Sequence, residues 1–418
     1  MRSKEQQLRD RILGEGVAIR LYWTDLAWGA AIAAMFAICL ELFYRMIINY
    51  NDKYMSDMRY YVVTRMQKGL SHNRILTYIF QKLYNINEST MEINIYLAAV
   101  IAAIIVANFM VIRLFLKEDG MFESVPRYSM QAASLAALFV GPIYFPVLHE
   151  WYYRHSFESF AWHSPTQQSM VLFSILAILC FLKMFLNYEE GISPVWWFAT
   201  MAMCLMSTSC KPSFIVDFIL TVIIFFLVEL FAGDKENLMK RFGKLFIMGA
   251  ALIPSGIYTL ILQADEFGEV TPDGEAHHIV FGLKVLLSHE DVMREIIFGM
   301  GFAIIVVAAN IKRFKDSKYF LTMLIFLTGV FQWGFFTETG KRANYGNFDW
   351  GRMFGNYFLS LVCLALLLEN IYVKDSVFPG HPRARKIYIA IALIVLAMSV
   401  LSQLNYFRLI LTGHGYML

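Results

Sequence analysis

Residues 93–115 read INIYLAAVIAAIIVANFMVIRLF, an apolar segment long enough to cross a hydrocarbon core of about 30 Å. Backbone N–H and C=O groups inside lipid must be satisfied internally, so such a run is expected to form a helix. Comparable runs recur along the chain. The predicted spans are roughly eleven, at residues 26–48, 93–115, 130–148, 168–187, 194–209, 213–232, 245–263, 295–311, 319–337, 353–373 and 387–406. This pattern predicts an all-α, polytopic membrane helix bundle.

Composition supports a membrane protein. The chain has 418 residues, of which 58% are hydrophobic and 17% charged, whereas about 25% charge is usual for soluble domains. The lipid bilayer is therefore a predicted partner. A net charge of +3 gives no indication of nucleic-acid binding. The five cysteines fall in or at the ends of apolar segments and form no CxxC pair, so we interpret them as small core residues.

The connectors between the predicted spans sort by charge. The N-terminus (1–25) and the short connectors at 113–117, 235–244, 312–318 and 374–386 are rich in Lys and Arg, which predicts a cytoplasmic location. The other set, expected on the outer face, comprises 49–92, 149–167, 207–213, 264–294, 338–352 and the C-terminus. Basic residues within 49–92, and their absence near Tyr188–Glu190, weigh against this sorting.

One membrane domain covering 1–418 is predicted, because no Pro/Gly/Ser-rich linker or soluble segment interrupts the spans. The first 25 residues are polar and mixed in charge, so we expect no removable signal peptide. The first span is expected to direct insertion.

The first outer loop, 49–92, holds an acid close to the first span. It begins NDKYMSDMRYY (51–61), and further on ILTYIF (75–80) opens a segment whose apolar positions suit a helix with one apolar face. We therefore expect interfacial helices in this loop, including one over residues 75–84.

This layout resembles the GT-C class of membrane glycosyltransferases. In that class an Asp or Glu early in the first long outer loop is catalytic, and juxtamembrane helices follow it. By this resemblance Asp57 is the base that deprotonates an acceptor hydroxyl, and Asp52 is the competing candidate. A hydroxyl that attacks an activated sugar needs such a proton acceptor. The alternative is that Asp57 is only a solvated loop acid.

A second candidate patch contains Trp151, Trp162 and His163, and runs on through Ser164, Pro165 and Thr166. It is similar to a Trp-His-Asn-Pro-Thr stretch of bacterial membrane proteins associated with polysaccharide assembly, from which Ser164 departs. We interpret the two tryptophans as platforms for a sugar ring and His163 as a donor to a phosphate or a sugar hydroxyl. Aromatic anchoring at the membrane interface is the alternative.

Two further patches carry cations. Lys211 lies in the turn 207–213, just before Pro212 and a helix N-terminus, which suits a phosphate unless the lysine only reaches to the interface. Asp217 follows inside the next predicted span. In the loop 338–352 the candidate ligands for phosphate or sugar are Lys341, Arg342, Asp349 and Arg352. The acids and histidines of 264–294 could bind a divalent ion, but their spacing matches no defined metal site, so no metal or other cofactor is predicted.

Together these patches predict a membrane glycosyltransferase on the outer face of the bacterial cytoplasmic membrane. It would transfer a sugar or oligosaccharide from a polyprenyl-phosphate or polyprenyl-pyrophosphate donor to a glycan or lipid-linked acceptor, in polysaccharide or glycoconjugate assembly of the cell envelope. The alternatives are a transporter or flippase for lipid-linked oligosaccharides and a membrane acyltransferase. A transporter is expected to place polar residues at mid-membrane depth in broken helices. An acyltransferase is expected to have a reactive histidine buried in the membrane.

Overall fold

The helices follow the apolar runs of the sequence. The computed structural model describes residues 22–48, 57–64, 66, 75–145, 158–232, 237–267, 279–282, 292–338 and 348–413. The long helices are α2 (Trp23–Ile48), α6 (Met91–Glu118), α8 (Pro165–Phe185), α9 (Pro194–Cys210), α10 (Ser213–Ala232), α14 (Val292–Ala309), α15 (Ser317–Phe335), α16 (Asp349–Tyr372) and α17 (Pro382–Leu411). The shorter elements are α3 (Asp57–Arg59), η1 (Tyr60–Thr64), α5 (Ile75–Asn87), η2 (Phe122–Ser124), α7 (Arg127–Ala136), η3 (Ala137–Phe139), α11 (Leu238–Ala250), α12 (Ile253–Phe267), β1 (Ile279–Phe281), η5 (Ile311–Lys315) and β2 (Phe336–Glu338).

The fold is an all-α bundle with the features of a polytopic membrane protein. Among the described residues, seven helices are long and apolar enough to cross a membrane: α2, α6, α8, α10, α14, α16 and α17. The pair α11–α12, bent by 42°, brings the number to eight if the two form one span. The predicted number of about eleven is therefore not confirmed by the described residues. Helices α9 and α15 coincide with predicted spans but are not among these seven helices. Helix α9 has only 17 residues.

The predicted span 130–148 is not a continuous helix over the part that the structure describes. Helix α7 and the 3-10 turn η3 end before Val140, and an extended segment follows. Pro142 explains the break, because proline lacks an N–H and disfavours helical backbone at the residue before it. The Ser399 hydroxyl of α17 bonds the Gly141 N–H at 2.8 Å and the Gly141 carbonyl at 2.5 Å. These bonds replace the intrahelical partners that the extended backbone lacks.

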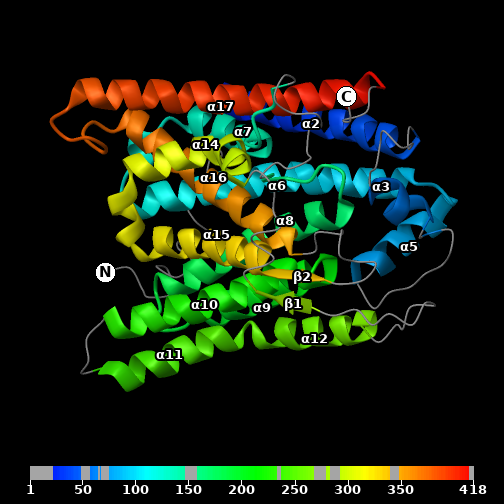
Figure 1. The fold of residues 1–418 in the computed structure, drawn as a ribbon, viewed down its shortest axis with the longest axis horizontal. Coiled ribbons are helices and arrows are strands. Elements are labelled where there is room, and N and C mark those ends of the chain that lie inside the picture. The colour runs from blue at the N-terminus through cyan, green and yellow to red at the C-terminus, as the bar shows by residue number, and fades with distance from the viewer. Residues whose placement is uncertain are drawn as a thin grey trace, which may run out of the picture.

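Figure 1 shows α17 and α2 along one edge of the bundle and the bent pair α11–α12 along the opposite edge. The short helices α3 and α5 lie at one end, which we call the α3 end. The helix expected over residues 75–84 is confirmed as α5, with Leu76 and Phe80 buried and Tyr78 exposed. Strands β1 and β2 pair antiparallel, Ile279 opposite Glu338, and so join the segment before α14 to the end of α15.

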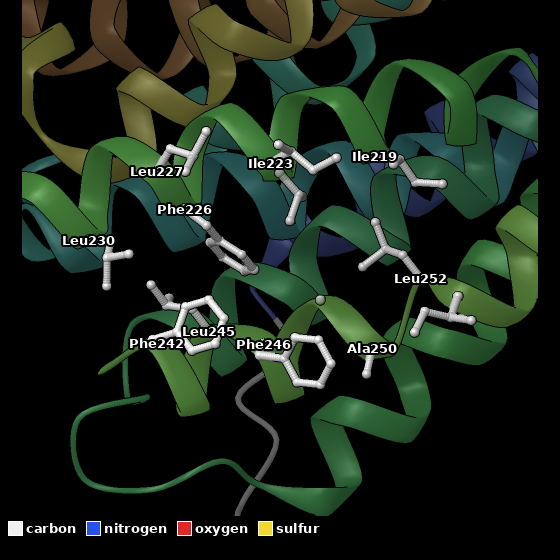
Figure 2. A pocket seen from close by; sticks show the side chains of 13 residues that line it. Ile219, Ile223, Phe226, Leu227, Leu230, Phe242, Leu245, Phe246, Ala250 and Leu252 are labelled. Atoms are coloured by element: carbon white, nitrogen blue, oxygen red, sulfur yellow. The ribbon is translucent and has the colours of Figure 1, made fainter. Parts of the chain in front are cut away.

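An apolar cavity of about 380 Å³ lies between α10 and the bent pair α11–α12. Figure 2 shows Ile219, Phe226 and Phe246 among its lining side chains, and every lining residue is apolar. Ile219 follows Asp217 by two residues, so on α10 the two side chains point in nearly opposite directions. The cavity can hold hydrocarbon but offers no group that would bind a sugar or phosphate.

The hairpin of α15 and α16 depends on glycine at its closest contacts. A Cβ added at Gly329 would lie 2.8 Å from the Cα and N of Arg352, and one added at Gly355 would lie 2.8 Å from the Cα of Phe326. Small residues allow this close approach of helix backbones, which is a common way for helices to associate in membranes.

Gly355→Ala is expected to destabilise the protein, because the new methyl group meets backbone atoms that cannot move away without separating α15 from α16. Overpacking of this kind costs about 1–3 kcal/mol. The matched control is Gly243→Ala in α11, where a Cβ meets nothing within 4 Å. Thermal unfolding of the purified protein in detergent should show a lower midpoint for Gly355→Ala only. Equal midpoints for the two variants would contradict this account of the hairpin.

Candidate functional site

Four segments that are distant in sequence meet near the α3 end. Asp57 opens α3, His163 precedes α8, Lys211 separates α9 from α10, and Trp350 lies in the first turn of α16. The Lys211 Nζ lies 3.0 Å from the centre of the Trp350 ring, and the His163 ring centre lies 6.4 Å from that ring. Asp57 and Lys211 are both close enough to His163 to shift its pKa. We call these four residues the four-segment site.

The position of Asp57 is fixed by the short helix that it begins. Met58 is completely buried, and Arg59 Nη1 donates to the Ile47 carbonyl of α2 at 3.4 Å. Helix α3 is thereby held against the end of the first span. The π-helix η1 follows directly, and π-helical turns frequently occur at functional sites. Asp57 itself is partly exposed.

Lys211 occupies the break between two helices. Its N–H donates to the Ser207 carbonyl at 2.9 Å, which closes the last turn of α9, and its own backbone is extended. Pro212 comes next, and its carbonyl accepts from the N–H groups of Ile215 and Val216 at the start of α10. The ammonium group lies against the Trp350 ring, and this cation–π contact holds it at the site.

His163 is electrostatically balanced between two neighbours. Burial lowers its pKa below the usual value, the charge of Lys211 lowers it further, and the Asp57 carboxylate opposes both. The imidazole is therefore neutral at pH 7. A neutral imidazole can accept a proton or a hydrogen bond through one nitrogen while it donates through the other.

A second group of charges surrounds the first turn of α16. Arg352 is 2% exposed and its Nε lies 2.7 Å from the Asp349 Oδ1. Its guanidinium also lies 5.4 Å from the centre of the Trp333 ring. Burial raises the pKa of Glu158 well above its ordinary range; Arg352 counteracts this shift and Asp349 adds to it. Burial therefore favours the protonated form of Glu158, an acid that sequence reasoning missed.

Asp217 of α10 packs against this turn from another side. It is 2% exposed, and neither carboxylate oxygen has a hydrogen-bond partner among the described residues. A Cβ added at Gly351 would lie 1.6 Å from its Oδ2. Glycine at position 351 therefore makes room for the Asp217 carboxylate. An unpaired acid inside a span is costly and marks a functional candidate.

One sequence-based interpretation is wrong. Trp162 was expected to stack on a sugar ring, but it is completely buried, with ring centres of Phe160 and Phe407 at 4.7 and 4.6 Å and that of Phe139 at 6.0 Å. Aromatic side chains of the core surround the ring, so no face is open to a ligand. The carbonyl of Trp162 accepts from Gln168 Nε2 at 2.6 Å, which ties this loop to α8.

The structure brings together several other predicted residues. His163, Lys211 and Asp57 belong to the four-segment site. Asp349 pairs with Arg352, and a direct contact of Arg352 with phosphate stays a prediction. Asp52, Trp151, Lys341 and Arg342 lie outside the described residues. Within the described part of the chain, no three His, Cys, Asp or Glu side chains are grouped as metal ligands.

Two buried amides were also given no role by the sequence. Gln167, in the first turn of α8, is completely buried, and Asn94, in the first turns of α6, is 1% exposed. Neither side chain has a hydrogen-bond partner among the described residues. Asn94 lies within an otherwise apolar run, and a buried amide in such a run is the signal that would have pointed to it.

The fold and the site together define the class of protein. It is a polytopic helical membrane protein with acids, cations and a histidine collected near one end of the bundle. A comparison with protein-family models finds no match to this chain, and a comparison with curated protein sequences finds none either.

Proposed function

We propose that this protein is a membrane glycosyltransferase that takes a sugar or oligosaccharide from a polyprenyl-phosphate or polyprenyl-pyrophosphate donor. The acceptor is a glycan or a lipid-linked saccharide, and the reaction takes place on the outer face of the bacterial cytoplasmic membrane. The observation that carries this proposal is the meeting of Asp57, His163 and Lys211 near the α3 end. A proton acceptor and a phosphate-seeking cation are what glycosyl transfer from a phosphate requires.

In the proposed reaction Asp57 takes the proton of the acceptor hydroxyl. The acceptor oxygen bonds to the anomeric carbon as the bond from that carbon to the phosphate oxygen breaks. The phosphate leaves with the electron pair, and Lys211 stabilises its negative charge. Neutral His163 orients Asp57 or the acceptor hydroxyl by a hydrogen bond. The Arg352–Asp349 pair, with Glu158 beside it, holds the first turn of α16 and so positions Trp350 against Lys211.

A transporter or flippase for lipid-linked oligosaccharides is the second candidate. The extended segment at Gly141 interrupts a predicted span, and Asp217 is an unpaired acid within α10. Broken helices and buried acids of this kind are typical of transport pathways. The two functions differ in their product. An enzyme yields a new glycosidic bond in detergent solution, whereas a transporter moves an unchanged lipid across a sealed vesicle.

Lys211→Met is expected to raise the KM for the lipid-linked donor about tenfold or more, because the loss of a charged contact with phosphate costs roughly that factor. It should lower kcat as well, because the charge that develops on the leaving phosphate is no longer stabilised. The assay supplies purified protein with a panel of polyprenyl-linked sugars and follows the glycosylated product. The matched control is Lys244→Met, since Lys244 Nζ donates to the Glu189 carbonyl at 2.6 Å beyond the opposite end of α9. Equal KM values for the donor in the Lys211→Met and Lys244→Met variants would argue against the phosphate role of Lys211. Vesicle transport without any transfer product would favour the second candidate.

A further inference from the structure

The Gln167 side chain has an unmet hydrogen-bonding requirement. It is completely buried at the start of α8, yet neither its Oε1 nor its Nε2 has a partner among the described residues. An amide buried in this way is costly unless a ligand or an ordered water completes its hydrogen bonds. Its neighbour Gln168 differs, because its Nε2 donates to the Trp162 carbonyl.

The direction of Gln167 follows from the contact between α8 and α9. The Ser174 hydroxyl of α8 lies 2.8 Å from the Ser207 hydroxyl of α9. Gln167 precedes Ser174 by seven residues, which is two turns along the same face of the helix. Lys211 follows Ser207 by four residues, one turn further toward the same end. Gln167 therefore faces the C-terminal end of α9, where Lys211 lies.

The backbone at this point also favours an anion. Helix α8 has 21 residues and begins with Pro165 at its first position. The N–H groups of Thr166 and Gln167 in its first turn have no carbonyl within the helix to bond. The aligned peptide dipoles add partial positive charge at this terminus, and Lys211 contributes a full charge nearby.

We propose that Gln167, the first turn of α8 and Lys211 bind one phosphate group of an anionic ligand. Lys211 supplies the charge, the helix terminus and Gln167 Nε2 donate hydrogen bonds to phosphate oxygens, and Gln167 Oε1 accepts one from a hydroxyl on the ligand. The identification of that phosphate with a lipid-linked sugar donor rests on the proposed function. The assignment of a phosphate as the ligand rests only on Gln167, Lys211 and the N-terminus of α8.

The test is direct binding to the full-length protein in nanodiscs, without any assay of transfer. The probes are inorganic pyrophosphate, farnesyl diphosphate and phosphatidylglycerol added to the bilayer. Each is followed through its dissociation constant and its effect on the unfolding temperature, because a ligand that binds only the folded state stabilises it. Preference for farnesyl diphosphate identifies a prenyl-linked phosphate, equal binding of pyrophosphate identifies a free phosphate, and saturation by phosphatidylglycerol identifies a headgroup.

Gln167→Leu separates ligand binding from packing. If the amide serves the ligand, this variant keeps or gains thermal stability without ligand, because a buried polar group is replaced by an apolar one of similar size. It then binds the preferred probe about tenfold more weakly. Gln167→Glu places a carboxylate where the phosphate would bind, so it should abolish binding. Ser174→Ala, which removes the α8–α9 contact on the same face, is the control and should bind as the wild type does.

Two results would overturn the proposal. One is a Gln167→Leu protein that binds all the probes with wild-type affinity, and the other is a wild-type protein that binds no phosphate probe. Phosphate binding weakened by Gln167→Leu, with no sugar transfer from any donor, would support this site while it counts against the proposed function. The two proposals can therefore fail separately.

Discussion

Asp57→Asn is expected to lower kcat for sugar transfer by at least about 100-fold, since general-base catalysis typically contributes a factor of about 10² to 10⁴. Asparagine has nearly the shape of aspartate, but it cannot accept the proton of the acceptor hydroxyl. Asp57 is partly exposed and belongs to a short helix held by Met58 and Arg59, so the fold should tolerate the change. The KM for the donor should change little, in contrast to Lys211→Met.

The measurement is initial rates with purified protein and a polyprenyl-linked sugar, with the unfolding temperature as a check on folding. Glu190→Gln is the matched control, because Glu190 is an exposed acid in the connector between α8 and α9, away from the site. Asp52→Asn is measured in parallel. If Asp57→Asn retains full activity, the role of base passes to Asp52 or Asp349.

Most of the helices could be predicted because apolar length is a property of the sequence alone. The run at 93–115 became α6, Met91–Glu118, with ends shifted by only two or three residues. The run at 130–148 failed, although Gly141 and Pro142 stood in it. Apolar composition hid the break, and its stabilising partner, Ser399, comes from a helix 258 residues away. Hydropathy cannot reveal such a partner.

The candidate site was partly accessible to sequence reasoning. Asp57, His163 and Lys211 could be selected because charged and ionisable residues next to apolar spans are costly and therefore informative. Their meeting depends on helix packing, which no single segment encodes. Trp162 shows the same limit, because a tryptophan beside a span looks alike whether it faces a ligand or, as here, Phe139 and Phe407. The fit of Asp217 beside Gly351 likewise appears only when α10 packs on α16.

The opposite end of the bundle contains a balanced charge network. Asp119, at the end of α6, is paired with Lys318 of α15 and accepts from the Tyr319 hydroxyl at 2.6 Å. Arg313 Nη2 lies 2.9 Å from carboxylate oxygens of both Asp119 and Glu369. Two acids and two bases therefore join the ends of α6 and α16 to the start of α15. The side chains of Asp119, Glu369 and Lys318 are 4%, 5% and 10% exposed, so water screens their charges little.

Asp119→Asn is expected to lower the free energy of unfolding by about 3–5 kcal/mol, because removal of one partner leaves Lys318 buried and unpaired. The double variant Asp119→Asn/Lys318→Met should recover much of this loss, since replacing both members of a buried pair is often nearly neutral. Asp316→Asn is the matched control. Asp316 lies 3.7 Å from Arg313 Nη1 but is 54% exposed, so its loss should cost no more than about 1 kcal/mol.

Thermal and denaturant unfolding in detergent are measured for the wild type and the three variants. If the double variant unfolds as easily as Asp119→Asn alone, the buried charge of Lys318 is not the cause of the loss, and the contact with Tyr319 becomes the explanation.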